Sequence, residues 1–115
     1  MTEAQIQAQV VQYLQKEHIF FHSIPNEAAG NDVRRQTQFV AMGLRKGVAD
    51  MFVWWPDGKP GYLEMKTPTG KQSDVQKVFE RKCDEYGIRY DVARSVADVA
   101  RLVGKYSWTN NVQVT

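Results

Sequence analysis

Three side chains, Asp50, Glu64 and Lys66, have the types and the spacing of a metal-assisted hydrolytic site. Glu64 and Lys66 are two residues apart in the segment 61–66, which reads as a strand, so both side chains project from one face. Asp50 stands at the start of the apolar segment 51–55, which also reads as a strand. We expect the two strands to pair and to bring the three groups together.

The connection between these strands predicts a β-hairpin, because the Asp-Gly pair at 57–58 is a strong turn signal. A turn of three or five residues there would place Asp50 opposite Lys66 and Phe52 opposite Glu64. Asp50 and Glu64 would then be diagonal neighbours on one face of the hairpin, within reach of a shared cation.

Two carboxylates with open positions for water favour Mg²⁺ or Mn²⁺, and the carbonyl oxygen of Met65 is a further candidate ligand. Such an ion can polarise a phosphoryl oxygen and lower the pKa of water. Lys66 could orient the attacking water or stabilise the pentavalent phosphorus. The alternative is an ordinary surface ion pair, since a Glu-x-Lys triplet is common in strands.

The chain has 115 residues and a net charge of only +2, which fits one domain over 1–104 followed by a tail at 105–115. A single cysteine, Cys83, excludes an intrachain disulfide. No apolar run approaches the length of a membrane span, and the N-terminus lacks the pattern of a signal peptide. We therefore expect a cytoplasmic protein, of a bacterial cell or a phage-infected host, with no membrane partner.

The periodicity predicts an α/β fold, in which a small mixed β-sheet is flanked by helices. Residues 32–42 fit either a short helix or an ordered loop. In the helix after Ser73, one face should carry Val75, Val78, Phe79, Lys82, Cys83 and Tyr86. Besides the hairpin, the expected elements are a helix from Thr2 to about 17, a strand over 19–24, the helix from Ser73 to Gly87, a strand over 88–93 and a helix from Ser95 to Gly104.

Basic residues lie on both sides of the acidic centre in the sequence, where they could hold phosphates or could be solvated surface charges. Asn26 fits a substrate contact and a loop-ordering role equally. Trp54 and Trp55 fit hairpin packing or base stacking. The candidate nucleic-acid-binding residues are Arg34, Arg35, Arg45, Lys46, Lys71 and Asn26.

Glu3 and Gln76 each have a structural and a catalytic interpretation. Glu3 lies on the apolar stripe of the first helix, where a carboxylate is unusual unless it meets a cation, but it also lies in the first turn, where negative charge favours the helix dipole. Gln76 completes a capping box with Ser73, which explains it without chemistry.

Residues 43–50 (GLRKGVAD) and 62–66 (YLEMK), followed by Gln76, resemble the motifs of the VRR-NUC family of virus-type replication and repair nucleases. Glu3, Gln7 and residues 24–27 (IPNE) are similar to its earlier blocks, so the resemblance covers about 3–100. One departure is Ala49, where the family often has proline. The resemblance implies a restriction-endonuclease-like PD-(D/E)xK core and catalytic roles for Asp50, Glu64, Lys66, Glu3 and Gln76.

The same resemblance implies an Mg²⁺- or Mn²⁺-dependent endonuclease that cuts DNA. Small stand-alone members are similar to this chain in size, and several are homodimers that cut four-way junctions. A symmetric dimer would match the two-fold symmetry of such a junction. The run 18–24 and the aromatic residues Tyr106 and Trp108 could form an interface or belong to the monomer's core. The alternative is a non-catalytic nucleic-acid-binding module on the same fold.

Overall fold

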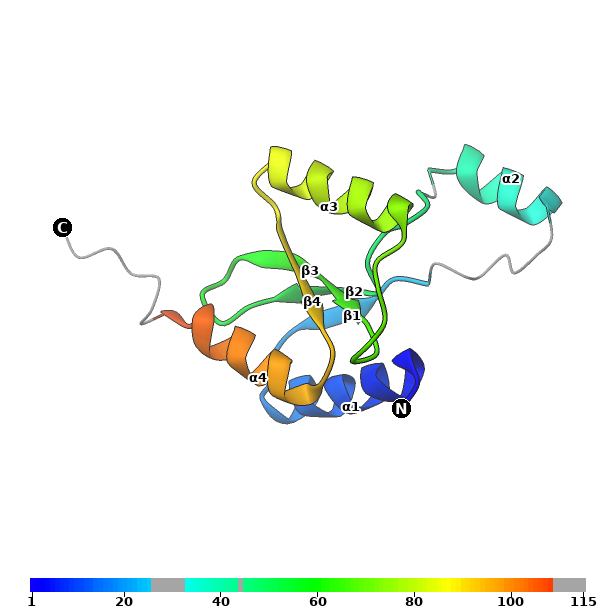
Figure 1. The fold of residues 1–115 in the computed structure, drawn as a ribbon. Coiled ribbons are helices and arrows are strands. Elements are labelled where there is room, and N and C mark those ends of the chain that lie inside the picture. Colours follow the sequence, from blue (N-terminus) through cyan, green and yellow to red (C-terminus); the bar gives the residue numbers. More distant parts are fainter. Residues whose placement is uncertain (26–32, 44, 109–115) are drawn as a thin grey trace.

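The computed structural model describes residues 1–25, 33–43 and 45–108, except for the side chains of residues 33, 35, 36 and 39. Within them the chain forms a mixed sheet between two helical layers, which confirms the predicted fold class (Figure 1). The elements are α1 (Glu3–Lys16), β1 (Phe21–Ser23), α2 (Val33–Ala41), β2 (Met51–Trp54), β3 (Pro60–Met65), α3 (Asp74–Glu85), β4 (Arg89–Ala93) and α4 (Val96–Lys105).

The sheet has the order β1-β2-β3-β4, in which the pairs β1–β2 and β2–β3 are antiparallel and the pair β3–β4 is parallel. The helix α3 covers one face and connects β3 to β4, while α1 and α4 cover the other (Figure 1). Within the ambiguous segment 32–42, residues 33–41 form the helix α2, which projects away from the sheet in the same view.

The main core lies between the sheet and the pair α1 and α4. Alternate residues of the strands point into it, and α1 contributes a stripe at a spacing of four residues, as an amphipathic helix does. A capping box between Thr2 and Gln5 starts α1 as predicted. The buried core residues of α1, β2 and β3 are Ile6, Val10, Leu14, Met51, Val53, Leu63 and Met65.

The expected face of α3 is only partly correct. Phe79 and Cys83 are buried against the other face of the sheet, but Val75, Val78 and Tyr86 are exposed to 48%, 42% and 74%. The stripe predicted from periodicity is wider than the surface that the short strands can cover. The helix therefore leaves apolar side chains uncovered within the described chain.

The predicted hairpin is present, but its register is wrong by two residues. Met51 pairs with Leu63 and Trp54 with Pro60, so the ladder continues toward Asp50 opposite Glu64 rather than Lys66. The turn is centred one residue earlier than expected. Gly58, with φ of 82°, takes the last position of the turn 55–58, and the Trp55 amide donates to the Lys59 carbonyl directly after it. An offset of two residues keeps every side chain on its predicted face.

An ion pair anchors this turn to the rest of the molecule. The guanidinium of Arg89 donates to both carboxylate oxygens of Asp57, at 2.9 Å and 2.5 Å, and Asp57 Oδ1 also accepts from the Lys59 amide. The Asp57 side chain is 3% exposed, and the Arg89 guanidinium stacks 4.0 Å from the centre of the Tyr106 ring. This contact ties the hairpin to β4 and to the end of α4.

Replacement of Asp57 by alanine should lower the free energy of unfolding by about 3 kcal/mol, because it leaves Arg89 without its partner at a largely buried position. Urea denaturation would measure the change. The exposed neighbour Lys59 is the control, and Lys59→Ala should cost less than about 0.5 kcal/mol. Equal losses in the two variants would show that the ion pair does not hold the turn.

Candidate active site

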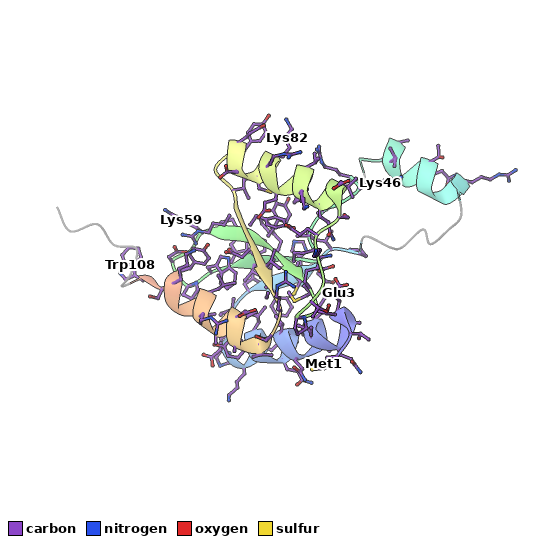
Figure 2. All side chains as sticks on the ribbon, viewed as in Figure 1. Met1, Glu3, Lys46, Lys59, Lys82 and Trp108 are labelled. Atoms are coloured by element: carbon purple, nitrogen blue, oxygen red, sulfur yellow. The ribbon has the colours of Figure 1, made fainter. Side chains whose placement is uncertain are left out.

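The predicted catalytic residues converge at one end of the sheet, where the chain enters β2 and leaves β3. Asp50 immediately precedes β2, Glu64 lies in β3, and Lys66 follows the last residue of β3. Gln76 comes from the first turn of α3. Glu3 lies at the start of α1, beside this end of the sheet (Figure 2). Residues that are distant in the sequence thus meet through the hairpin and two helix N-termini.

The two carboxylates are held by different partners. Asp50 Oδ2 accepts a hydrogen bond of 2.7 Å from the backbone amide of Met65 across the hairpin. Glu64 Oε2 accepts a bond of 2.9 Å from the side-chain amide of Gln76. The negative charge of Asp50 also acts on Glu64. Each carboxylate is therefore held by a hydrogen bond from a different part of the chain.

Glu64 is the most unusual group of the site, because it is only 1% exposed. Its second oxygen, Oε1, is buried and has no hydrogen-bond partner among the described residues. Burial raises the pKa of Glu64 to about 8, and the nearby charge of Asp50 contributes in the same direction. Burial also raises the pKa of Asp50, against the bond from the Met65 amide. Two carboxylates in one partly dry site resist being ionised together.

Lys66 is 7% exposed, and its charge acts on both carboxylates. Its Nζ is 3.7 Å from Glu3 Oε1, and the Glu3 side chain is 51% exposed. Glu3 thus meets a cation, as one of the two interpretations of its position required. Its place in the first turn of α1 satisfies the helix-dipole interpretation as well.

Gln76 caps α3 as predicted and also contacts a carboxylate of the site, while a catalytic role for it stays a prediction. Its oxygen Oε1 accepts from the Ser73 amide at 2.9 Å, which completes the capping box of α3. That bond fixes the orientation of the amide, so its NH₂ group is the part that faces Glu64. One side chain thereby starts the helix and positions a site carboxylate.

The donor set fits a hard cation. A buried carboxylate oxygen without a partner is costly unless a ligand satisfies it, and Glu64 Oε1 lies beside a second carboxylate, that of Asp50. Among the described residues no group of three or more His, Cys, Asp or Glu could hold a metal ion. The protein therefore offers two carboxylates, and water or substrate oxygens would complete the shell. The structure gives Met65 a contact through its amide, while a ligand role for its carbonyl stays a prediction.

The predicted nucleic-acid-binding residues are more scattered. Arg45 and Lys46 are exposed in the turn before Asp50, and Lys46 lies near the N-terminal end of α3 (Figure 2). Arg34 is exposed on α2, away from the site. Lys71 is exposed in the loop after β3. Asn26 and the Arg35 side chain lie outside the described part of the chain.

The two tryptophans separate clearly. Trp55 is 1% exposed in the core, which excludes base stacking for it, whereas Trp54 lies on the other face in an aromatic cluster with Phe20 and Phe52. The histidines behave as helix-end and strand residues: His18 follows α1 with a positive φ, and His22 lies in β1.

Sequence reasoning missed Arg94. Its Nη1 donates to the carbonyls of Thr67 and Gly70 at 2.6 Å and 2.7 Å, so it holds the loop that follows Lys66. The parallel pairing of Met65 with Ala93 places Arg94 beside Lys66. The signal was available, because residues that follow adjacent parallel strands lie at the same sheet edge.

The comparisons with known proteins agree with this arrangement. The model of the VRR-NUC domain matches residues 2–97, so the chain belongs to the VRR-NUC family, whose members are generally metal-dependent nuclease domains. A search of curated proteins finds no match.

Two solved structures are similar in fold. A "VRR_NUC domain protein" superimposes with a TM-score of 0.73 at 17% identity, over 92% of this chain and 88% of that one. A "VRR_NUC domain" gives 0.66 at 18% identity, over 92% and 99%. In the described part of the chain, no helix is long and apolar enough to cross a membrane.

Without divalent ions, the protein should lose stability as the pH rises from about 5 to about 8. Folded Glu64 keeps its proton up to a pKa of about 8, whereas the ordinary value is 4.5. The folded state then binds more protons than the unfolded state in that window, and the free energy of unfolding falls with rising pH. Melting temperatures in a chelator would measure this, and Glu64→Gln should flatten the slope. An equally steep slope in that variant would contradict the assignment.

Proposed function

We propose that this chain is a Mg²⁺- or Mn²⁺-dependent endonuclease that hydrolyses DNA phosphodiester bonds. The observation that carries the proposal is the unpartnered oxygen of buried Glu64 beside Asp50, with Lys66 next to both. A purely structural ion pair would not leave a buried carboxylate oxygen unsatisfied. Membership in a family of nuclease domains supports the same activity.

The protein's own groups prepare the site for a cation and a phosphate. The Met65 amide fixes Asp50 and the Gln76 amide fixes Glu64, so the two candidate ligands need little reorganisation. Asp50 and Glu64 would hold the ion, which would supply Lewis-acid polarisation of the phosphate and a hydrolytic water of lowered pKa. Glu64 must release its proton to bind the ion.

Lys66 supplies the positive charge that faces the reacting phosphate in this proposal. It is largely withdrawn from solvent, so its charge acts in a medium that screens it weakly. Glu3, at 3.7 Å, restrains the ammonium without covering it, since Glu3 itself is half exposed. Glu3 is thus a positioning residue for Lys66, and Lys66 stabilises negative charge on the phosphate in the transition state.

A non-catalytic nucleic-acid-binding module with this fold is the alternative. Such a module would keep the basic surface but would have no need for the buried pair Asp50 and Glu64, which costs stability. The complete set of Asp50, Glu64 and Lys66, brought to one place with supporting bonds, favours the enzyme. A DNA substrate also fits the expected cytoplasmic location.

Asp50→Asn and Glu64→Gln should each abolish cleavage of DNA in Mg²⁺ or Mn²⁺, because each removes a ligand charge. Both variants should remain folded, since each substitution relieves a repulsion between carboxylates. Divalent ions should raise the melting temperature of the wild type and much less that of the variants. Asp84→Asn, an exposed carboxylate of α3, is the matched control and should cleave normally. Normal cleavage by either site variant would remove this site from the mechanism.

We further propose that the working form is a homodimer that acts on branched DNA. Among the described strands, β1 is an edge strand that pairs with β2 alone, and an edge strand can pair with a strand of a second copy. Beside it lies an aromatic cluster of Phe20, Trp54, Phe52 and His22, with ring centres 4.7 Å to 6.0 Å apart. Phe20 is 68% exposed there.

The run 18–24 is divided, because Ile19 and Phe21 pack against the core whereas Phe20 is exposed. The exposed ring supports an interface at this position, since a large apolar surface costs free energy until it is covered. Tyr106 belongs to the monomer, where its hydroxyl donates to Asp91 at 3.0 Å. Trp108 is 67% exposed. A second copy related by two-fold symmetry would bring two sites to opposed strands of a junction.

Light scattering at micromolar concentration should report a dimer, and Phe20→Ser should shift it to a monomer. Tyr86→Ser is the matched control, since Tyr86 is an equally exposed aromatic residue on α3, outside the cluster at β1. A monomeric wild type would contradict the dimer. For the substrate, cleavage of a four-way junction should exceed that of linear duplex of equal length. Equal rates would leave a general endonuclease.

A further inference from the structure

An open, basic cavity of about 490 Å³ lies on the β4 side of the candidate active site. Its walls come from the loop after β3, from α3, from β4 and from α4. The polar and basic side chains that line it are Lys71, Gln72, Lys77, Arg94 and Arg101, and Val92 lines it as well.

Strand pairing shows how close this cavity is to the carboxylates. Val92 is the partner of Glu64 in the parallel ladder, so the two residues share a face of the sheet on neighbouring strands. The same register brings Arg94 beside Lys66. Because adjacent strands are about 4.8 Å apart, the cavity occupies the next position across the sheet from the site.

The charge of the cavity is opposite to that of the carboxylate pair. Four cationic side chains face a single carboxylate, that of Asp98. Asp98 is already engaged, since it accepts from the Arg94 amide at 2.8 Å and pairs with Arg101. The cavity therefore has an excess of positive charge and of N–H donors, which suits an anion.

Two hydrogen bonds to the loop after β3 hold Arg94 in place beside the cavity. Its bonds to the carbonyls of Thr67 and Gly70 both use Nη1, one nitrogen of a group with five N–H donors. Gly70 packs so closely on Thr67 that a Cβ there would lie 2.8 Å from Thr67 Oγ1. The loop and the guanidinium thus form a fixed wall, and Lys71 and Lys77 are exposed at the rim.

We propose that this cavity binds a phosphate group of the nucleic acid, about one or two nucleotides from the phosphate that is cleaved. This inference rests on the proposed function, because it gives the path of the cleaved DNA strand, which would run from the carboxylates into the cavity. It makes a DNA phosphate the ligand of Lys71 and Lys77, and it adds Arg94 and Arg101 as phosphate-binding residues that the sequence analysis did not name. Lys77 and Lys71 supply charge, whereas Arg94 supplies directed donors.

The first experiment uses inorganic phosphate as the probe and needs no cleavage. In ¹H–¹⁵N spectra of the metal-free chain, added phosphate should shift the Gln72 side chain and the backbone amides of 69–72 and Arg94. The double variant Lys71→Ala/Lys77→Ala should lose these shifts, whereas Lys59→Ala, at the hairpin turn, should keep them. Shifts elsewhere, or equal shifts in the double variant, would overturn the proposal. An inactive metal centre would not affect this result.

The second experiment measures DNA binding by fluorescence anisotropy with the Asp50→Asn chain in a chelator. The double variant should weaken binding about tenfold or more and reduce the slope of log affinity against log salt by about one, with no such change in Lys59→Ala. Equal losses for oligonucleotides with a 5′-phosphate and a 5′-hydroxyl identify an internal backbone phosphate. A loss confined to the 5′-phosphate identifies a terminal one. No loss for either would overturn the proposal.

Discussion

Two carboxylates, Asp50 and Glu64, are held side by side in one site, and Glu64 there is almost wholly excluded from water. This arrangement opposes folding when both groups are charged, since burial and mutual repulsion act in the same direction. The protein reduces the cost by raising the pKa of both groups, and a bound cation would remove it. The stability of the domain and its proposed chemistry therefore depend on the same pair.

The rest of the fold holds that pair in place. The hairpin register sets Asp50 against the Met65 amide, and the ion pair of Asp57 with Arg89 fixes the turn that determines this register. The capping residue of α3, Gln76, reaches Glu64. The loop held by Arg94 follows directly after the strand that carries Glu64. Elements that begin or end near the site thus act as its supports.

Much of this arrangement follows from local sequence patterns. Caps at Thr2, Ser73 and Ser95 and alternation in the strands predicted the elements. The common face of Glu64 and Lys66 stays a prediction from their two-residue spacing. The register was not predictable from the turn signal alone, because the position of Gly58 within the turn depends on the tertiary contact of Asp57 with Arg89. The role of Arg94 was missed although a signal existed, because Arg94 and Lys66 follow adjacent parallel strands and so lie at the same sheet edge.

The central claim is that Asp50 and Glu64 jointly hold a divalent cation. Anomalous diffraction at the manganese edge, from crystals equilibrated with Mn²⁺, tests it most directly. The account predicts a single strong peak at each site, coordinated by the Asp50 carboxylate and by Glu64 Oε1, the oxygen that has no partner among the described residues. The absence of a peak between these two carboxylates, with ordered protein around them, would contradict the account.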